Sequence, residues 1–258
     1  MRYLRGHLTE IRARLLPQRR VLLLMDFDGT LSPLADTPEK AHLPQNVRQV
    51  LLRLAFQPRV RVAILSGRPL GYLKAVFGAP NFFYGGNHGL QMEGPGFSFR
   101  HPGACALSRV VQKLVRQFRK PIKGVSGALL ENKGLSLALH YRNVPRAHRP
   151  HFDALVEKLQ NKTADLPVRW RPGNKVWELL PRVDWDKGRG AEALIRHLDH
   201  PFPLAVGDDK TDEDMFEALS RKGITVHVGG DGDSSAQFCL KRQSEMPRFL
   251  RFLEGVLK

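Results

Sequence analysis

The chain has 258 residues, 42% of them hydrophobic, and a formal net charge of +16. This composition is typical of a globular protein with a large core and excludes an intrinsically disordered chain. No apolar run approaches the length of a membrane-spanning helix, about 20 residues, and the basic N-terminal segment lacks the apolar centre of a signal peptide. We therefore expect a cytoplasmic protein, and two isolated cysteines, Cys105 and Cys239, fit a reducing compartment.

The positive charge is concentrated in the middle of the chain, where residues 91–180 hold 16 Lys/Arg against six Asp/Glu. Such a balance is compatible with an ordinary basic surface, with acidic small substrates or with nucleic acid. The basic residues are scattered singly, without an arm of interleaved aromatics and without an RNA-binding signature. Nucleic acid therefore remains an alternative partner that no motif supports.

Short apolar runs alternate with helical patterns along the first and last parts of the chain. The runs lie at residues 21–25, 60–65, 82–84, 203–206 and 224–228. Because each run is brief and nearly all apolar, it is typical of a strand that is covered on both faces of a parallel sheet. Helical spacing at residues 43–54 and 191–198 predicts helices that cover this sheet. The predicted fold class is therefore α/β, with a parallel-sheet core.

The middle of the chain has a different pattern. Residues 134–142 alternate strictly between apolar and polar side chains, which predicts a strand with one buried and one free face. The segment also contains a hairpin pattern at residues 91–102, helical patterns at 107–118 and 152–159, and a strand pattern at 175–181. We therefore expect an inserted α+β domain at residues 89–182, within a core made of residues 1–88 and 183–258.

The stretch VLLLMDFDGTL carries two aspartates directly after the first apolar run. Residues two apart in an extended chain point the same way, so Asp26 and Asp28 share a side while Phe27 packs away. Open α/β sheets bind their ligands at the carboxyl ends of the strands, where this pair lies. Two clustered carboxylates repel each other, and Mg²⁺, a hard cation that prefers oxygen ligands, is the natural candidate to compensate them.

A second acidic cluster, GDDKTDED, follows the fourth apolar run. Thr211 and Asp214 have the spacing of a helix capping signal, and Glu213 suits a helix N-terminus. Asp208 and Asp209 lie before that predicted cap, so capping does not explain them. Neither acidic cluster has the spacing of an EF-hand. Asp208 and Asp209 are therefore candidates for a second set of metal ligands.

Two further polar residues lie where a strand ends or a helix begins. Ser66, in AILSGRP, follows the second apolar run and, with nearby backbone N–H groups, can hold a phosphate oxygen. Lys187 begins a predicted helix, where a positive charge works against the helix dipole. A phosphate beside the lysine would explain that placement.

Taken in this order, DFDGT, Ser66, Lys187 and GDDKTD resemble the signature of the haloacid dehalogenase-like (HAD) phosphatase superfamily. The resemblance implies a HAD-like Rossmannoid core and a Mg²⁺-dependent phosphatase that works through an aspartyl-phosphate. It implies that Asp26 is the nucleophile and that Asp28 is the general acid and base. Ser66 and Lys187 would bind the transferring phosphoryl group.

The same resemblance implies a metal site. Mg²⁺ would be held by the Asp26 carboxylate, the backbone carbonyl of Asp28 and Asp208, with Asp209 or Asp212 helping directly or through water. Two unit charges about 4 Å apart repel by roughly 4 kcal/mol at an effective dielectric constant near 20. An anionic nucleophile therefore needs nearby positive charge, from the cation and from Lys187, before it can approach a phosphate ester.

The spacing of the motifs indicates where the inserted domain belongs. Only 40 residues separate Asp26 from Ser66, whereas 121 residues separate Ser66 from Lys187 and leave room for an α/β lid. In the superfamily this is the second cap type, which usually acts on small phosphorylated molecules. A lid excludes bulk water and brings specificity groups to the substrate.

Within that lid, LENKGLSLALHYR and KVWELLP resemble the trehalose-6-phosphate phosphatase family, which carries "LExK…HYR" and "xVxE" patterns. The resemblance implies hydrolysis of trehalose 6-phosphate to trehalose and phosphate. It also implies sugar contacts from Glu131, Lys133, Arg142 and Glu178, with Asn87 and His88 near the sugar.

Two other interpretations stay open. A HAD phosphatase for another phosphosugar, such as sucrose 6-phosphate or mannosyl-3-phosphoglycerate, would share the core motifs but lack the combined lid pattern. A non-catalytic basic nucleic-acid-binding protein on the same scaffold would have no need of the intact Asp26, Lys187 and Asp208. We therefore expect a small-molecule phosphosugar and no membrane as the partner, and a monomer is compatible with the sequence.

Overall fold

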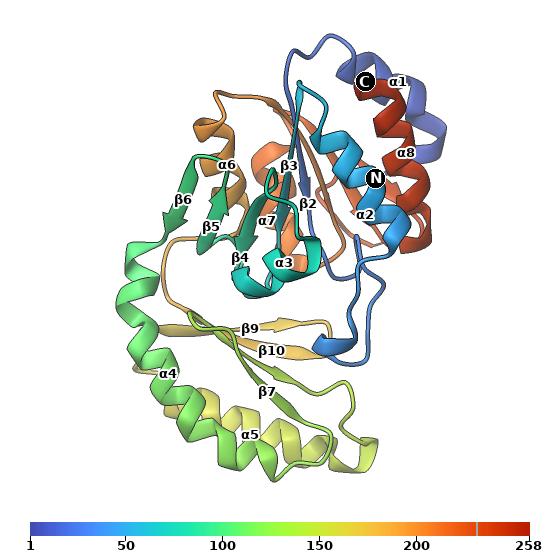
Figure 1. Cartoon of the computed structure of the whole chain (residues 1–258). Helices are drawn as coiled ribbons and strands as arrows, with labels where there is room; N and C mark the ends of the chain where they lie inside the picture. The colour runs from blue at the N-terminus through green and yellow to red at the C-terminus, as the bar shows by residue number, and fades with distance from the viewer. Residues whose placement is uncertain (231) are drawn as a thin grey trace. The chain divides into compact units, whose positions relative to one another are not determined.

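The computed structural model describes residues 1–230 and 232–258. It divides into two compact units, which we call the core unit (residues 1–99 and 185–258) and the inserted unit (residues 100–184). The structure contains one nine-stranded and one four-stranded sheet (Figure 1). None of the described helices is long and apolar enough to cross a membrane.

The nine-stranded sheet belongs to the core unit and has the strand order β1-β13-β12-β11-β2-β3-β4-β5-β6. Its strands are β1 (Arg2–Tyr3), β2 (Val21–Met25), β3 (Val60–Leu65), β4 (Phe83–Gly86), β5 (Gln91–Gly94), β6 (Phe97–Arg100), β11 (Phe202–Gly207), β12 (Ile224–Val228) and β13 (Phe238–Leu240). All neighbours from β1 to β4 are parallel, whereas β5 pairs antiparallel with β4. The five predicted apolar runs all lie in this sheet, because parallel strands buried on both faces require apolar side chains throughout.

Helices cover both faces of the core sheet. One face is covered by α1 (Leu8–Leu15), α2 (Gln45–Ala55), α3 (Leu70–Phe77) and α8 (Met246–Leu257), and the other by α6 (Lys187–His197) and α7 (Lys210–Leu219). Successive side chains of β2 point to opposite faces of the sheet, so Leu23 packs with the first group of helices, and Leu22 and Leu24 pack with the second. Short 3₁₀ turns lie at η1 (Leu4–His7), η2 (Pro38–Lys40) and η4 (Gln243–Glu245).

The hairpin predicted at residues 91–102 is present, but it extends the core sheet beyond β4 rather than belonging to the inserted unit. Met92 of this hairpin is fully buried in the apolar cluster under α6 and α7. Gly94 lies against the ring of Phe83, and a Cβ at this position would come within 2.3 Å of it. Because the hairpin packs in this way, the inserted unit begins at residue 100, whereas the sequence analysis placed its start at residue 89.

The chain leaves the core unit after Phe99 and returns to it at Trp185. The two rings stack with their centroids 4.7 Å apart and their planes at 20°. Both side chains also pack against the apolar cluster that Met92, α6 and α7 share. The two points where the core chain is interrupted are therefore joined by a contact inside the core unit itself.

The inserted unit has an antiparallel sheet in the order β7-β8-β10-β9 and two long helices. Its elements are α4 (Pro102–Lys123), β7 (Leu129–Asn132), β8 (Leu137–His140), η3 (Arg146–His148), α5 (Arg149–Lys162), β9 (Val168–Gly173) and β10 (Val176–Pro181). His101 caps α4 by accepting a hydrogen bond from the backbone N–H of Ala104 at its Nδ1, at 3.3 Å. The predicted strand at 134–142 forms β8 over four residues only, because a turn after β7 precedes it.

The four-stranded sheet has one apolar and one polar face. Leu137, Leu139 and Leu179 pack with α4 and α5, which lie together on one side of the sheet (Figure 1). The strand register places Glu131 opposite Ala138 and Ala138 opposite Glu178, so these residues share the other face. This polar face is not covered by any described helix of the inserted unit.

Candidate active site

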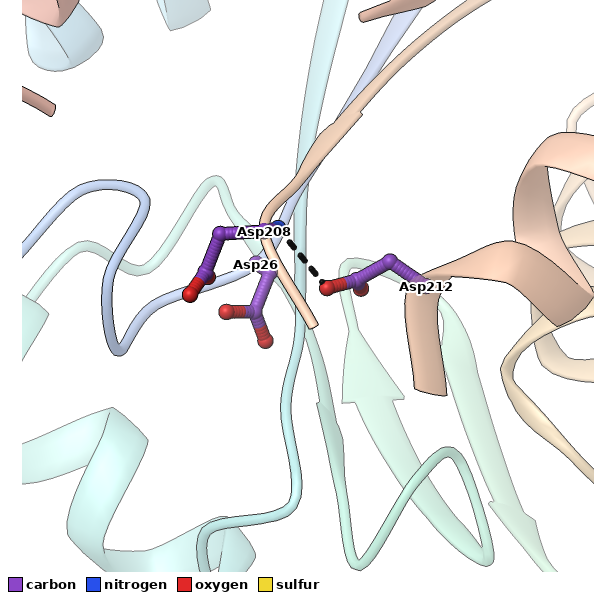
Figure 2. Close-up of side chains that lie close together, drawn as sticks. All are labelled: Asp26, Asp208 and Asp212. Atoms are coloured by element: carbon purple, nitrogen blue, oxygen red, sulfur yellow. Dashed lines mark hydrogen bonds between the residues drawn. The ribbon is translucent and has the colours of Figure 1, made fainter. Parts of the chain in front are cut away.

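Carboxylates gather at the carboxyl end of the core sheet, where β2 and β11 finish side by side. Figure 2 shows Asp26 after β2, Asp208 after β11 and Asp212 on α7 turned toward one another, and one carboxylate oxygen from each lies within 4.8 Å of the others. The backbone N–H of Asp26 donates to the carbonyl of Val206 at 2.9 Å, which fixes the two strand ends together. The two acidic stretches of the sequence therefore meet at one point.

Gly29 allows this close approach. It has a φ of +82°, and a Cβ there would lie 2.0 Å from an oxygen of the Asp208 carboxylate. A glycine accepts both the left-handed backbone conformation and the contact, whereas any other residue would displace Asp208. The glycine of DFDGT is thus explained by its distance from the second acidic cluster, and Thr30 adds a hydrogen bond from its Oγ1 to Asp208 Oδ1 at 2.9 Å.

Lys187 lies at the start of α6 and is 2% exposed. Its Nζ donates to Asp26 Oδ1 and to Asp212 Oδ1, both at 2.7 Å. These two carboxylates, rather than a phosphate alone, explain why the chain tolerates a buried lysine at a helix N-terminus. The structure therefore brings the predicted residues Asp26 and Lys187 into direct contact.

Asp212 is fully buried, and both of its carboxylate oxygens have protein donors. Oδ1 accepts from Lys187, and Oδ2 accepts from the backbone N–H groups of Asp208 and Asp209, each at 3.0 Å. Asp209 is the N-cap of α7 and forms a capping box with Asp212. The sequence analysis placed the cap at Thr211 and Asp214, which was wrong by two residues, and capping does explain Asp209.

The charges of this cluster do not balance, and the pKa values reflect that. Burial, with the nearby negative charges of Asp212 and Asp28, raises the pKa of Asp26 to about 8, although Lys187 works in the opposite direction. Burial and the charges of Asp26 and Asp212 raise the pKa of Asp208 well above its usual range. Burial lowers the pKa of Lys187, but Asp212 and Asp26 outweigh it and raise that pKa overall.

Two of the three carboxylates thus share one lysine, and the remaining negative charge of the cluster requires protons or a cation. One oxygen of Asp26 and one of Asp208 have no donor among the described residues. These oxygens are hard donors, which suit a divalent cation that prefers carboxylate ligands. The residues therefore fit a metal ion on charge, donor chemistry and proximity.

Ser66, Asn87 and His88 lie on the neighbouring strands of the same sheet edge. Ser66 follows β3 and is 2% exposed, and its backbone carbonyl accepts from the N–H of His88 at 2.9 Å. Asn87 and His88 follow β4 with φ values of 51° and 58°. Two consecutive residues other than glycine in the left-handed region are uncommon and carry a conformational cost, so the surrounding contacts hold them there.

Asp28 lies beside this cluster but forms a separate pair. Its two carboxylate oxygens accept from Nε and Nη2 of Arg68, both at 2.7 Å. The sequence analysis quoted Arg68 within AILSGRP but gave it no role. The available signal was a long cation two residues beyond Ser66 at a strand end, yet no spacing rule indicates which carboxylate such a side chain reaches.

Four of the predicted sugar contacts lie in the inserted unit, and three of them belong to acid–base pairs on its polar face. Lys133 Nζ donates to Glu178 Oε1 at 2.5 Å, and both side chains are nearly buried. His140 Nε2 lies 2.8 Å from Glu131 Oε2. His140 was not among the predicted site residues, although the alternation of β8 places it on the same face as those acids.

Arg142 is positioned by a loop rather than by an acid. Its Nη2 donates to Oδ1 and to the backbone oxygen of Asn174, at 3.1 and 3.3 Å. The side chain lies beyond the end of β8 and is partly exposed. The four predicted contacts of the inserted unit therefore belong to one sheet and its adjoining loop, with Glu131, Lys133 and Glu178 fixed by the pairs described above.

The sequence matches the model of the trehalose-phosphatase family over residues 24–244. A trehalose-phosphate phosphatase of Mycobacterium marinum is 33% identical over 240 residues, which cover 89% of this chain and 60% of that protein. Trehalose-phosphate phosphatase B of Arabidopsis thaliana is 29% identical over 255 residues, with 91% of this chain and 66% of that protein covered. The chain therefore spans less than two thirds of the length of these relatives.

Solved structures show the same fold. The C-terminal domain of a trehalose-6-phosphate phosphatase from C. albicans superposes with a TM-score of 0.82 at 22% identity, covering 96% of each chain. A haloacid dehalogenase-like hydrolase from Bacteroides thetaiotaomicron superposes with a TM-score of 0.62 at 14% identity, covering 90% of this chain and 98% of the other. The predicted α/β class with a HAD-like parallel-sheet core is confirmed.

Proposed function

The chain belongs to the trehalose-phosphatase family, and we propose that it hydrolyses trehalose 6-phosphate to trehalose and phosphate with the help of Mg²⁺. The observation that carries this proposal is the buried contact of Lys187 with Asp26 and Asp212, beside Asp208. A carboxylate that is to attack a phosphate ester needs a fixed cation beside it, and this arrangement supplies one.

In the proposed reaction, an oxygen of Asp26 bonds to phosphorus while the bond from phosphorus to the sugar oxygen breaks. Asp28 gives its proton to that leaving oxygen. Water then attacks the phosphorus of the aspartyl-phosphate, Asp28 takes a proton from the water, and the bond from phosphorus to Asp26 breaks. Each residue thereby returns to its starting state, with trehalose and phosphate released.

Positive charge at the phosphoryl group comes from Lys187 and from a metal ion. We propose that Asp26, Asp208 and the backbone carbonyl of Asp28 hold Mg²⁺, which would offset the repulsion between the nucleophile and the phosphate. Asp209 or Asp212 would help to hold the metal directly or through water, and both also orient the loop that carries Asp208. Ser66 would hold a phosphate oxygen.

We propose that polar residues of the inserted unit and of the core unit contribute to sugar recognition. Glu131, Lys133, Glu178 and Arg142 provide carboxylate acceptors and cationic donors on or beside the polar face of the inserted sheet. Paired charges of this kind suit a neutral, hydroxyl-rich disaccharide, because each group has an internal partner before the substrate arrives. Asn87 and His88 would contribute from the core unit.

We propose that this reaction takes place in the cytoplasm, because two isolated cysteines in the sequence, Cys105 and Cys239, fit a reducing compartment. The expected partner is the phosphosugar itself, and a monomer provides every residue named above. The basic surface of the inserted unit needs no nucleic acid to account for it, because positive charge also steers anionic small substrates.

The direct test is phosphate release from a panel of phosphosugars, with Mg²⁺ and with EDTA. Trehalose 6-phosphate should be the best substrate, and EDTA should stop the reaction. Preference for sucrose 6-phosphate or mannosyl-3-phosphoglycerate would favour a different phosphosugar specificity. No release from any ester at saturating Mg²⁺ would exclude an enzymatic role for this chain.

A further inference from the structure

Arg68 and Asp28 form a bidentate ion pair at the edge of the candidate active site. The guanidinium donates from Nε to one oxygen of Asp28 and from Nη2 to the other, each at 2.7 Å. The Arg68 side chain is 11% exposed, and that of Asp28 is 31% exposed. Parallel hydrogen bonds between a guanidinium and a carboxylate fix direction as well as distance, which a lysine could not do.

Arg68 is itself fixed from several sides. Its Nη1 donates to the carbonyl of Pro38 at 2.9 Å, and its guanidinium lies over the ring of Tyr72 at 4.8 Å. Its backbone N–H donates to Ser66 Oγ at 3.3 Å, and its backbone carbonyl accepts from the N–H of Asn87 at 2.9 Å. The guanidinium is therefore a rigid reference point and not a flexible surface group.

The side chain of Asp28 needs a fixed partner that restricts its rotation. It precedes Gly29, whose φ of +82° begins a loop, and it is the most exposed of the carboxylates with an assigned proton-transfer or nucleophilic role. Proton transfer requires the carboxyl group to lie within hydrogen-bond reach of the leaving oxygen and later of water. A side chain that is partly exposed and free to rotate would spend part of its time in other rotamers, at a cost in rate.

We propose that Arg68 is a positioning residue for the reaction proposed above, in that its guanidinium fixes the orientation of the Asp28 carboxyl group for proton transfer. The inference rests on the proposed phosphatase function. It requires Arg68 to act through Asp28 and not through the sugar, the phosphate or the stability of the fold.

A double-mutant cycle tests this requirement. We would measure kcat and KM for trehalose 6-phosphate with the wild type, Arg68→Met, Asp28→Asn and the double variant. Arg68→Met should lower kcat by about 10- to 100-fold and change KM by less than about threefold, because misplacing a catalytic group costs rate rather than binding. In the Asp28→Asn protein, the same arginine change should alter kcat by less than about twofold, because the group it orients has lost its function.

The leaving group provides a second readout. p-Nitrophenolate leaves without a proton, whereas a sugar alkoxide needs one. Arg68→Met should therefore cost p-nitrophenyl phosphate turnover less than trehalose 6-phosphate turnover, by about tenfold. Arg68→Lys, which keeps the charge but loses the parallel contact, should fall between the wild type and Arg68→Met on the sugar ester.

Arg48→Met is the matched control. Arg48 is a partly buried arginine of the core unit that donates from Nε to the carbonyl of Phe77 at 3.1 Å, with no acidic partner among the described residues. It should shift the unfolding temperature as much as Arg68→Met or more, yet leave kcat unchanged. If Arg68→Met is too unstable to assay, the cycle with Arg68→Lys makes the same comparison with smaller factors.

The outcomes separate the two proposals. Equal loss of kcat from the arginine change in both Asp28 backgrounds, or equal loss on both esters, would overturn the positioning role while the phosphatase function stands. A loss that appears mainly in KM would make Arg68 a substrate-binding residue and would also overturn it. A wild type that releases phosphate from neither ester refutes the proposed function itself.

Discussion

The two units of the molecule treat buried charge in opposite ways. In the core unit, Asp26 and Asp212 share the cation of Lys187, and Asp208 lies beside them with a hydrogen bond from Thr30, so negative charge is in excess. In the inserted unit, Glu178 is paired with Lys133, and Glu131 is paired with His140. Excess negative charge suits a cationic ligand, and paired charges suit neutral hydroxyls, in line with the two binding roles proposed above.

The largest expected effect on activity comes from the cluster of Asp26, Asp208 and Asp212. Asp26→Asn should abolish phosphate release, by about 10⁴-fold or more, because it removes the nucleophile. The protein should remain folded, because the amide that replaces the carboxyl group has the same size and keeps an oxygen that can accept from Lys187. Turnover within tenfold of the wild type would contradict the assignment of Asp26.

Removing one buried lysine from each unit, Lys187 or Lys133, tests whether the two units differ in their excess of buried negative charge. Lys187→Met leaves several buried carboxylates without a cation and should lower the free energy of unfolding by about 3–5 kcal/mol, in addition to abolishing turnover. Lys133→Met removes the cation from beside one acid, Glu178, so its effect on stability should be smaller. Urea unfolding of both variants, with EDTA present, measures the difference. Equal losses would show that the two buried lysines neutralise similar amounts of charge.

The pH dependence of stability should also separate the units. The pKa of Asp26 is raised to about 8 in the folded protein, against about 4 when unfolded. The folded state therefore holds a proton that the unfolded state has released, and in EDTA the unfolding temperature should fall as the pH rises from about 4 to 8. A scan of unfolding temperature between pH 5 and 9, with EDTA and with Mg²⁺, tests this. Saturating Mg²⁺ should flatten the curve, and two superimposable curves would argue against a metal at this cluster.

The smallest effect on activity is expected from a substitution in the inserted unit. Glu178→Ala should raise KM for trehalose 6-phosphate by about tenfold, the value of one or two lost hydrogen bonds. Turnover of p-nitrophenyl phosphate, which has no sugar to recognise, should change by less than about twofold. Equal losses on both esters would assign Glu178 and its partner Lys133 a purely structural role.

The proximity of Asp26 and Asp208 could be predicted from the sequence because its determinants are local. An apolar run that ends in an acid indicates both a strand and the edge at which the acid lies, which is why Asp26 and Asp208 could be brought together in advance. The contacts that were missed depend on tertiary packing. Arg68 reaches Asp28 only because β2 and β3 are neighbours, and His140 reaches Glu131 only because β7 and β8 pair in one register.

Two strands of the inserted sheet were also missed. β7 has the sequence LLEN, which is too short and too irregular to show a period of two. β9 does alternate over Val168–Arg171, but that run is only four residues long and ends at Pro172, a residue that disfavours a strand interior. The hairpin of β5 and β6 was predicted as a hairpin, but its sheet was not. Only the burial of Met92 and the contact of Gly94 with Phe83 assign it to the core unit.

The stacked rings of Phe99 and Trp185 have a consequence for how this architecture can vary. The Phe99–Trp185 contact joins the two points where the chain of the core unit is interrupted. The core unit can therefore hold its strand ends and Lys187 in position whatever segment is inserted between these two points. With such a contact in place, the inserted unit can be replaced or altered while the core unit keeps its structure. New substrates could then be acquired in the course of evolution without rebuilding the phosphate-handling chemistry.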